Sequence, residues 1–341
     1  MVPADENGIA LAARLLREGA LVAFPTETVY GLGGRADRLE SIREIFSAKG
    51  RPSTDPLILH LSDPDLAKAA AEGWVAEPLP KSAIILAQAL WPGPLTLILR
   101  RGTRVQLDMT AGLDTVALRC PLHPAARNLL QAVGSPVAAP SANRFGRISP
   151  TDADAVRQEL DGKIPLILDG GPCSVGLEST VVNLVGPTPE ILRPGAVTVE
   201  QIAELLGQKP LVRQAVAQKD KAQISPGQLA SHYAPRTPLY LCATPIRFFT
   251  PDFFHILFRG KPEKLPPTAL ALGTDGKTDS AARDLYRALR TADSSGAKSI
   301  LVEPVPDGPW CEAIRDRLHR ASSGTARWTG KAWEIKPGRP V

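Results

Sequence analysis

The stretch ALVAFPTETVYGLGG, residues 20–34, joins a short apolar run to a segment rich in glycine and hydroxyl groups. The apolar run, residues 20–24, predicts a buried strand that ends at Pro25. The glycines by themselves indicate an ordinary turn from a strand to a helix. The hydroxyl groups and the carboxylate beside them suit the binding of a small zwitterion. The pattern G-x-x-x-x-G-K-[ST] does not occur in the sequence, which excludes a P-loop.

Strand and helix signals alternate outward from this stretch as far as Leu206. Short apolar runs predict further strands at residues 57–61, 95–99, 115–119, 136–139, 164–168 and 180–184. Helical spacing and capping residues predict helices at 8–19, 39–48, 63–73, 150–160 and 199–206. This interleaving predicts an α/β or α+β sheet domain of roughly 200 residues.

The sequence changes character after residue 206. Residues 207–224 are polar and contain no convincing strand, and 225–235 are rich in turn residues. A second α/β pattern then follows, with strands expected at 239–242, 254–258, 270–272 and 299–302 and helices at 279–292 and 311–321. We therefore expect a domain at 1–206, a linker at 207–237 and a smaller Rossmann-like domain at 238–341. The second domain has no G-x-G-x-x-G motif, so nothing supports dinucleotide binding there.

Composition narrows the class of protein. Of the 341 residues, 43% are hydrophobic and 22% are charged, which is typical of a globular protein in water. The four cysteines are far apart and form no C-x-x-C pair, so neither a zinc site nor a disulfide scaffold is indicated. The first residues do not resemble a signal peptide, and no apolar run has the length of a membrane span. We expect a cytoplasmic location and no membrane partner.

The net charge of +5 is unevenly distributed. Residues 1–205 carry 19 Lys and Arg against 23 Asp and Glu, whereas residues 206–341 carry 21 against 12. The cations of the first half are therefore local, and a broad nucleic-acid surface is not favoured there. The basic second half leaves a weak contact with tRNA open, although modest positive charge is usually solvated surface.

Two polar pairs and one arginine are candidates for binding an anionic substrate. Lys49 and Arg51 are one residue apart, and Ser141 and Asn143 repeat that spacing, so each pair leaves one face of an extended chain. Together they suggest a phosphate site, although helix-end cations and capping residues would produce the same pattern. Arg119 ends an apolar strand and suits the capture of a carboxylate, or else an ordinary salt bridge.

Six motifs occur in order: FPTETVYGLG, KGRPSTDPLILH, AGLDTVALRCP, PVAAPSANRFGRISPT, DGGPCSVGLESTVVNL and ILRPGA. Together they closely resemble the YrdC-like domain of the threonylcarbamoyl-AMP synthase family, over residues 5–206. The stretch SPGQLASHYAP resembles the linker of the long, two-domain form of that family, and residues 238–325 resemble its C-terminal domain more loosely. The resemblance implies a YrdC-like twisted open sheet with flanking helices.

The resemblance also implies a reaction, in which L-threonine, bicarbonate (as CO2) and ATP give threonylcarbamoyl-AMP and pyrophosphate. The product would serve N6-threonylcarbamoyladenosine formation at tRNA position 37, through downstream threonylcarbamoyl-transfer proteins. Carried over from the family, threonine would contact Thr28, His60, Arg119, Ala139 and Ser179. ATP would contact Lys49, Arg51, Asp55, Thr115, Ser141, Asn143, Ser149, Arg193, His232 and Tyr233. Lys49 and Arg51 would be catalytic, and Mg2+ would be held mainly by the ATP phosphates without a metal site on the protein.

The chain departs from the family pattern at two places. Gln228–Ser231 replaces a basic stretch that usually precedes His232 and Tyr233, which we expect to form part of a lid over the nucleotide, residues 225–235. The Thr54-Asp55 order is also unusual and weakens a side-chain role for Asp55. Two alternatives remain: a carbamoyl-transfer module, which elsewhere accompanies acylphosphatase and zinc-finger segments, and an RNA-binding module that does no chemistry.

Overall fold

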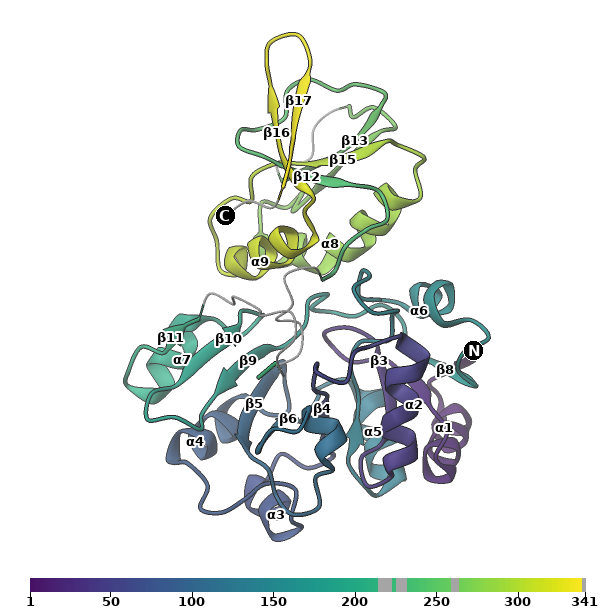
Figure 1. The fold of residues 1–341 in the computed structure, drawn as a ribbon, viewed down its shortest axis with the longest axis vertical. Helices are drawn as coiled ribbons and strands as arrows, with labels where there is room; N and C mark the ends of the chain where they lie inside the picture. The colour runs from purple at the N-terminus through teal and green to yellow at the C-terminus, as the bar shows by residue number, and fades with distance from the viewer. Residues whose placement is uncertain (214–222, 225–231, 259–263, 339–341) are drawn as a thin grey trace. The chain divides into compact units, whose positions relative to one another are not determined.

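The computed structural model describes residues 1–213, 223–224, 232–258 and 264–338. The chain divides into two units (Figure 1). The first contains residues 1–145, 149–174 and 178–230, and the second contains residues 146–148, 175–177 and 231–341. The expected domain limits at residues 206 and 237 stay predictions.

The first unit is built on a mixed sheet with the strand order β1-β8-β2-β3-β7-β4-β6-β5-β9-β10-β11. The strands are β1 Val2–Pro3, β2 Val22–Phe24, β3 Gly31–Arg35, β4 Ile58–His60, β5 Leu95–Arg100, β6 Thr115–Arg119, β7 Val137–Ala138, β8 Leu166–Asp169, β9 Thr180–Asn183, β10 Glu190–Arg193 and β11 Leu211–Val212. The helices are α1 Glu6–Glu18, α2 Leu39–Lys49, α3 Leu66–Ala71, α4 Lys81–Leu90, α5 Pro124–Val133, α6 Ala153–Leu160 and α7 Val199–Leu206, with a short 3-10 helix η1 at Leu107–Thr110.

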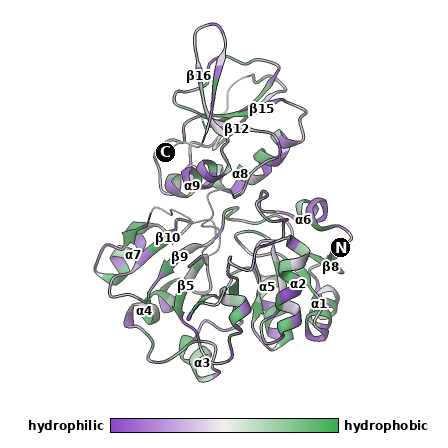
Figure 2. Cartoon of the chain, viewed as in Figure 1, coloured by the Kyte–Doolittle hydropathy of each residue, from purple (hydrophilic) through white to green (hydrophobic). Residues whose placement is uncertain are grey.

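Side-chain alternation along the central strands separates the core from the other face of the sheet. Leu59 of β4, Leu97 of β5 and Leu118 of β6 belong to the main core, with apolar residues of α2, α4 and α7. The alternate residues of the same strands, among them Ile58 and Ala117, form a much smaller cluster. Helices α1 and α2 are amphipathic, and Figure 2 shows hydrophobic and hydrophilic residues along each. One face of the central strands is therefore left for polar residues.

Strand β3 corrects the expectation of a turn within residues 25–34. It pairs antiparallel with β2 and with β7. A Cβ added at Gly33 would lie 2.8 Å from the ring of Phe24 and 2.9 Å from Val137. This glycine therefore permits close packing inside the sheet, a role that sequence alone does not distinguish from turn formation.

Several other elements differ from the sequence prediction. The helix expected from residue 63 begins at Leu66, because Asp65 is its N-cap and accepts a hydrogen bond from the Ala67 N–H. Helices α4 and α5 were not predicted from the sequence, and β11 lies in a segment for which no strand was expected. The expected helix ending at residue 160 is α6, and Asp152 caps it as anticipated.

The second unit contains a six-stranded sheet of order β14-β13-β15-β12-β16-β17, in which all neighbours are parallel except the last pair. Its strands are β12 Leu239–Cys242, β13 Phe253–Phe258, β14 Ala269–Leu272, β15 Ser299–Val302, β16 Gly324–Trp328 and β17 Trp333–Pro337, and its helices are α8 Thr278–Asp293 and α9 Cys311–Ala321. This confirms the expected smaller Rossmann-like layer, to which the structure adds the β16–β17 hairpin. None of the described helices is long and apolar enough to cross a membrane.

The packing of β6 predicts a stability difference between two nearby leucines. Leu118 is fully buried in the main core, whereas the Leu122 side chain is 53% exposed. Leu118→Ala should lower the free energy of unfolding by about 2–5 kcal/mol because it leaves a cavity. Leu122→Ala is the matched control and should change it by less than about 0.5 kcal/mol. Guanidinium chloride unfolding measures both, and equal losses would contradict this account of the core.

Candidate active site

A buried ion pair lies where β4 and β6 end together. The two strands are parallel, and His60 and Arg119, their last residues, are register partners. Arg119 donates from Nη2 to Glu27 Oε1 at 2.7 Å and from Nη1 to Thr28 Oγ1 at 2.8 Å. The Arg119 and Glu27 side chains are each only 4% exposed. A guanidinium held this firmly at a sheet edge is placed to receive a carboxylate.

Glu27 is the partner that keeps this arginine buried. Its second oxygen, Oε2, accepts the backbone N–H of Leu122 at 3.0 Å. Burial opposes ionisation of Glu27, but the charge and hydrogen bond of Arg119 outweigh it and lower the pKa of the carboxyl group. Glu27 is therefore ionised, and it fixes the direction of the Arg119 guanidinium.

His60 is neutral in this environment. Burial, together with the positive charge of Arg119, lowers its pKa to about 3. The ring packs edge-on against Phe24, and Nδ1 lies 3.1 Å from the Ile58 carbonyl oxygen. A neutral imidazole beside Arg119 suits a hydrogen bond with an uncharged amine or hydroxyl group.

A second polar set lies at the same level of the sheet, on β5, on β10 and in the residue that directly precedes β9. Thr96 Oγ1 and Ser179 Oγ are 2.7 Å apart, and both side chains are buried. Arg193 donates to the Ser179 hydroxyl and to the Ser179 carbonyl, each at 3.1 Å. Thr96 lies one residue beyond the paired Leu97 and Leu118, so it is level with Arg119 on the neighbouring strand. The structure thus brings the two arginines to one side of the sheet.

Lys49 points inward and holds the loop that carries Ser141 and Asn143. Its side chain is 3% exposed, and Nζ donates to the Ser141 carbonyl at 2.5 Å and to the Asn143 carbonyl. Burial first, and then the charge of Arg51, lower its pKa well below the ordinary value. The structure therefore brings together the two polar pairs of the sequence analysis, and in this conformation the amine is occupied by backbone oxygens.

Arg51 and Asp55 form a buried pair that the sequence analysis did not foresee. Arg51 Nη2 lies 3.0 Å from Asp55 Oδ1, with the side chains 3% and 0% exposed. Arg51 also donates to the carbonyl oxygens of Asp55 and Pro56, at 2.9 and 2.8 Å. The Asp55 carboxylate therefore has a definite role, which is to hold Arg51.

A carboxylate orients Ser149. Thr115, in contrast, lies at the opposite end of β6 from Arg119. The Ser149 hydroxyl donates to Glu178 Oε1 at 2.5 Å, and both residues are buried. Thr115 begins β6, and since Arg119 ends that strand, the two Cα atoms are about 13 Å apart along it. The residues expected to contact ATP are therefore not confined to the end of β6 at which Arg119 lies.

His232 and Tyr233 belong to the second unit. Tyr233 is buried, stacks on Tyr286 at a ring distance of 5.9 Å, and lies under the Arg317 guanidinium at 5.3 Å. Residues 225–231, including the atypical Gln228–Ser231 stretch, lie outside the described residues. The lid over the nucleotide stays a prediction.

Three acidic or hydroxyl residues of this region were missed as site residues. Glu27 and Glu178 were noted only as parts of motifs, and Thr96 was not noted. An unpaired buried charge is costly, so an arginine at the end of a buried strand, such as Arg119, signals that a partner such as Glu27 exists. Periodicity along β5 would likewise have placed Thr96 on the polar face.

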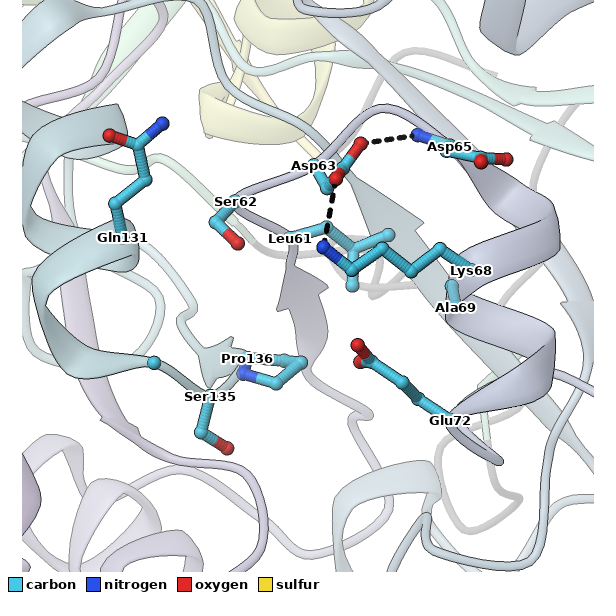
Figure 3. Close-up of a pocket in the computed structure, with 11 residues that line it drawn as sticks. Leu61, Ser62, Asp63, Asp65, Lys68, Ala69, Glu72, Gln131, Ser135 and Pro136 are labelled. Carbon is cyan, nitrogen blue, oxygen red and sulfur yellow. Dashed lines mark hydrogen bonds and ion pairs between the residues drawn. The ribbon is translucent and has the colours of Figure 1, made fainter.

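The cavities of the first unit include two that described residues line. One, of about 660 Å³, includes Arg51 and Thr54 in its lining. The other, of about 280 Å³, lies between α3 and the end of α5 and is lined by Asp63, Lys68, Glu72 and Gln131, among others (Figure 3). Lys68 is paired there with Asp63 at 3.0 Å. None of the expected site residues lines this second cavity.

Known proteins resemble the chain along nearly its whole length. Residues 14–195 match the family model of Sua5, YciO and YrdC proteins, described as telomere recombination. Residues 197–323 match the C-terminal domain of threonylcarbamoyl-AMP synthase. The threonylcarbamoyl-AMP synthase of Bacillus subtilis is 40% identical over 333 residues, and the match covers 94% of each chain. That of Pyrococcus abyssi is 36% identical over 327 residues, covering 93% of this chain and 95% of the relative.

A solved structure agrees in fold. The crystal structure of Pyrococcus abyssi Sua5 complexed with L-threonine superposes with a TM-score of 0.84 at 35% identity. The superposition covers 94% of this chain and 96% of the other. Both the sheet of the first unit and that of the second are therefore shared with a protein of known structure. The chain belongs to the two-domain Sua5 family of threonylcarbamoyl-AMP synthases.

Proposed function

We propose that this protein is an L-threonylcarbamoyladenylate synthase. It condenses L-threonine, bicarbonate (as CO2) and ATP into threonylcarbamoyl-AMP and pyrophosphate, for N6-threonylcarbamoyladenosine formation at tRNA position 37. The observation that carries the proposal is the buried Glu27–Arg119–Thr28 set beside neutral His60, in a chain that matches threonine-bound Sua5 over 94% of its length.

Threonine binds at the edge where β4 and β6 end. Its carboxylate pairs with Arg119, which Glu27 and Thr28 hold in place. Its amine and hydroxyl groups are bound by Thr28, His60, Ser179 and the Ala139 backbone. Since His60 is neutral, it does not repel the ammonium form and can form a hydrogen bond with the amine or hydroxyl group.

ATP binds along the neighbouring loops. The nucleotide contacts Lys49, Arg51, Asp55, Thr115, Ser141, Asn143, Ser149, Arg193, His232 and Tyr233. Lys49 and Arg51 are the catalytic cations, and Asp55 also holds Arg51, to which it is paired. Bound phosphates favour the protonated amine of Lys49 and so oppose the effect of its burial.

The reaction proceeds in two balanced steps. Bicarbonate supplies CO2 and hydroxide. The neutral threonine amine attacks CO2, and the proton that it loses converts the hydroxide to water, which leaves an N-carboxylate (a carbamate). A carbamate oxygen then attacks the α-phosphorus in line, forming the P–O bond as the bond to pyrophosphate breaks. Arg51 and Lys49 stabilise the charge that develops on the phosphoryl oxygens. Exclusion of water protects the product, because a mixed carbamic–phosphoric anhydride hydrolyses readily.

Mg2+ accompanies ATP in this proposal. The described residues contain no cluster of three or more His, Cys, Asp or Glu placed to hold a metal. The nearby carboxylates of Asp55 and Glu178 are engaged by Arg51 and Ser149. This donor set fits an ion carried by the phosphates, where it supplies charge neutralisation.

The reaction belongs in the cytoplasm, and its product passes to a tRNA threonylcarbamoyl-transfer protein. The four cysteines are buried free thiols, as is usual in a reducing compartment. The basic second half supports at most a weak direct contact with tRNA. The alternative of an RNA-binding module without chemistry would show a steep salt dependence of RNA affinity.

The reaction itself is the first test. The full-length protein incubated with ATP, Mg2+, bicarbonate and labelled threonine should release pyrophosphate and form threonylcarbamoyl-AMP. Omission of threonine or bicarbonate should abolish both, because the attacking carbamate cannot form. Pyrophosphate release that is independent of threonine would refute the proposed function.

Arg119 should control threonine binding. Arg119→Ala should raise KM for threonine by roughly 100-fold or more, because a charge-assisted hydrogen-bonded pair is lost. KM for ATP should change by less than about threefold. Arg100→Ala removes an exposed arginine from the adjacent strand and serves as the control. An unchanged KM for threonine in Arg119→Ala would show that the carboxylate binds elsewhere.

His60 should make the fold sensitive to acid. The unfolded chain protonates this residue near pH 6.5, but the folded protein only near pH 3, so stability falls as the pH is lowered between these values. From pH 7.5 to 5 the His60 contribution is a loss of about 2 kcal/mol. His60→Gln should lose correspondingly less over that interval in urea unfolding. Equal losses in the two proteins would contradict a neutral buried His60.

A further inference from the structure

A three-residue segment inside the ATP-binding motif belongs to the second unit. Residues 146–148 lie in sequence between Asn143 and Ser149, yet they pack with residues 231–341. Residues 175–177, which directly precede Glu178, do the same. Ser149 and Glu178 are hydrogen-bonded to each other at 2.5 Å. Ser149 and Glu178 therefore each come directly after a short segment that belongs to the second unit.

Asp293, the last residue of α8, is the centre of this attachment. Its Oδ2 lies 3.0 Å from Arg147 Nη2, with the two side chains 13% and 20% exposed. Its Oδ1 accepts the Thr237 backbone N–H at 2.7 Å. A carboxylate is unfavourable at the C-terminal end of a helix, where the dipole is negative. The position of Asp293 is therefore explained by these two partners and not by the helix.

The backbone of the segment is held as well. Arg290, one turn before Asp293 in α8, donates to the Ile148 carbonyl. The Ala234 N–H donates to the Gly146 carbonyl at 2.9 Å, within a short parallel bridge between Arg147 and Ala234. All three residues of the segment are thus bound to the second unit.

The other segment shows the same close fit. Gly176 has a φ of +78°, and a Cβ added there would lie 2.4 Å from the Arg283 carbonyl oxygen of α8. Any side chain at this position would displace the helix backbone. Helix α8 therefore contacts both segments, namely residues 146–148, which precede Ser149, and residues 175–177, which precede Glu178.

We propose that Arg290 and Asp293 of the second unit are positioning residues for ATP. They hold Arg147 and Ile148, and through the chain they set the place of Ser149 and of the Ser149–Glu178 hydrogen bond. The inference rests on the proposed function, in which Ser149 contacts ATP. It gives the second domain a part in nucleotide binding that does not involve contact with the substrate.

The Arg147–Asp293 pair provides the test. Asp293→Asn and Arg147→Gln should each weaken ATP binding by roughly five- to thirtyfold, and the double variant should be no weaker than the worse single one. Arg147→Lys keeps the charge and should restore most of the affinity. Arg287→Gln breaks an exposed pair with Asp284 on the same helix and should leave ATP binding unchanged.

Two measurements separate positioning from general damage. Calorimetric titration with a non-hydrolysable ATP analogue and Mg2+ reports nucleotide affinity even if no threonine-dependent turnover occurs, so failure of the proposed function is recognised independently. Steady-state kinetics should show KM for ATP raised and KM for threonine within about twofold of the wild type. Unchanged ATP affinity in Asp293→Asn, failure of Arg147→Lys to restore it, or an equal rise in both KM values would overturn the proposal.

Discussion

The ion pair between Arg119 and Glu27 is the constraint on which the candidate site depends. Both side chains are almost fully buried, and removal of one partner would leave the other charge uncompensated, at a cost of about 3–5 kcal/mol. Arg119 ends β6, whereas Glu27 lies in the segment between β2 and β3. The pair therefore ties the glycine-rich motif to the central strands. Because Thr28 is bonded to the same guanidinium, the orientation of that motif follows from the pair.

The sheet register extends this constraint to the rest of the polar face. His60, Arg119 and Thr96 are at one level on β4, β6 and β5. Their immediate neighbours on the strands, Leu59 and Leu118, lie in the main core. A shift of one residue would bury the polar set in that core and expose the leucines. The alternation of apolar residues that stabilises the sheet therefore also fixes which strand residues face the candidate site.

The sequence predicted the elements whose signal is local. Strands β6 and β12 and helices α7 and α9 have the expected bounds, because apolar runs, caps and turn residues mark both ends. Strand β3 was not predicted because Gly33 permits close packing against Phe24 of the neighbouring strand β2. A glycine in a sequence does not reveal such a contact. For the candidate site, the sequence identified Lys49 and Arg51 as candidates for phosphate binding, but it did not indicate where their side chains point. The carbonyl oxygens that Lys49 binds come from a loop about ninety residues further on, so only the fold reveals them.

The structure shows why such a site is shared among distant segments. Three buried cations are held by groups from other segments: Arg119 by Glu27, Lys49 by the Ser141 loop, and Arg193 by Ser179. In the proposed function, these bonds would orient the cations before substrate arrives, so that less ordering is required when ATP and threonine bind. In the same proposal, the loops that supply these groups would contribute to substrate affinity indirectly, because they hold the cations in place. A loop that carries both Asn143 and Ser149 needs support at both ends. Lys49 supports the first, and residues 146–148, which belong to the second unit, adjoin the other.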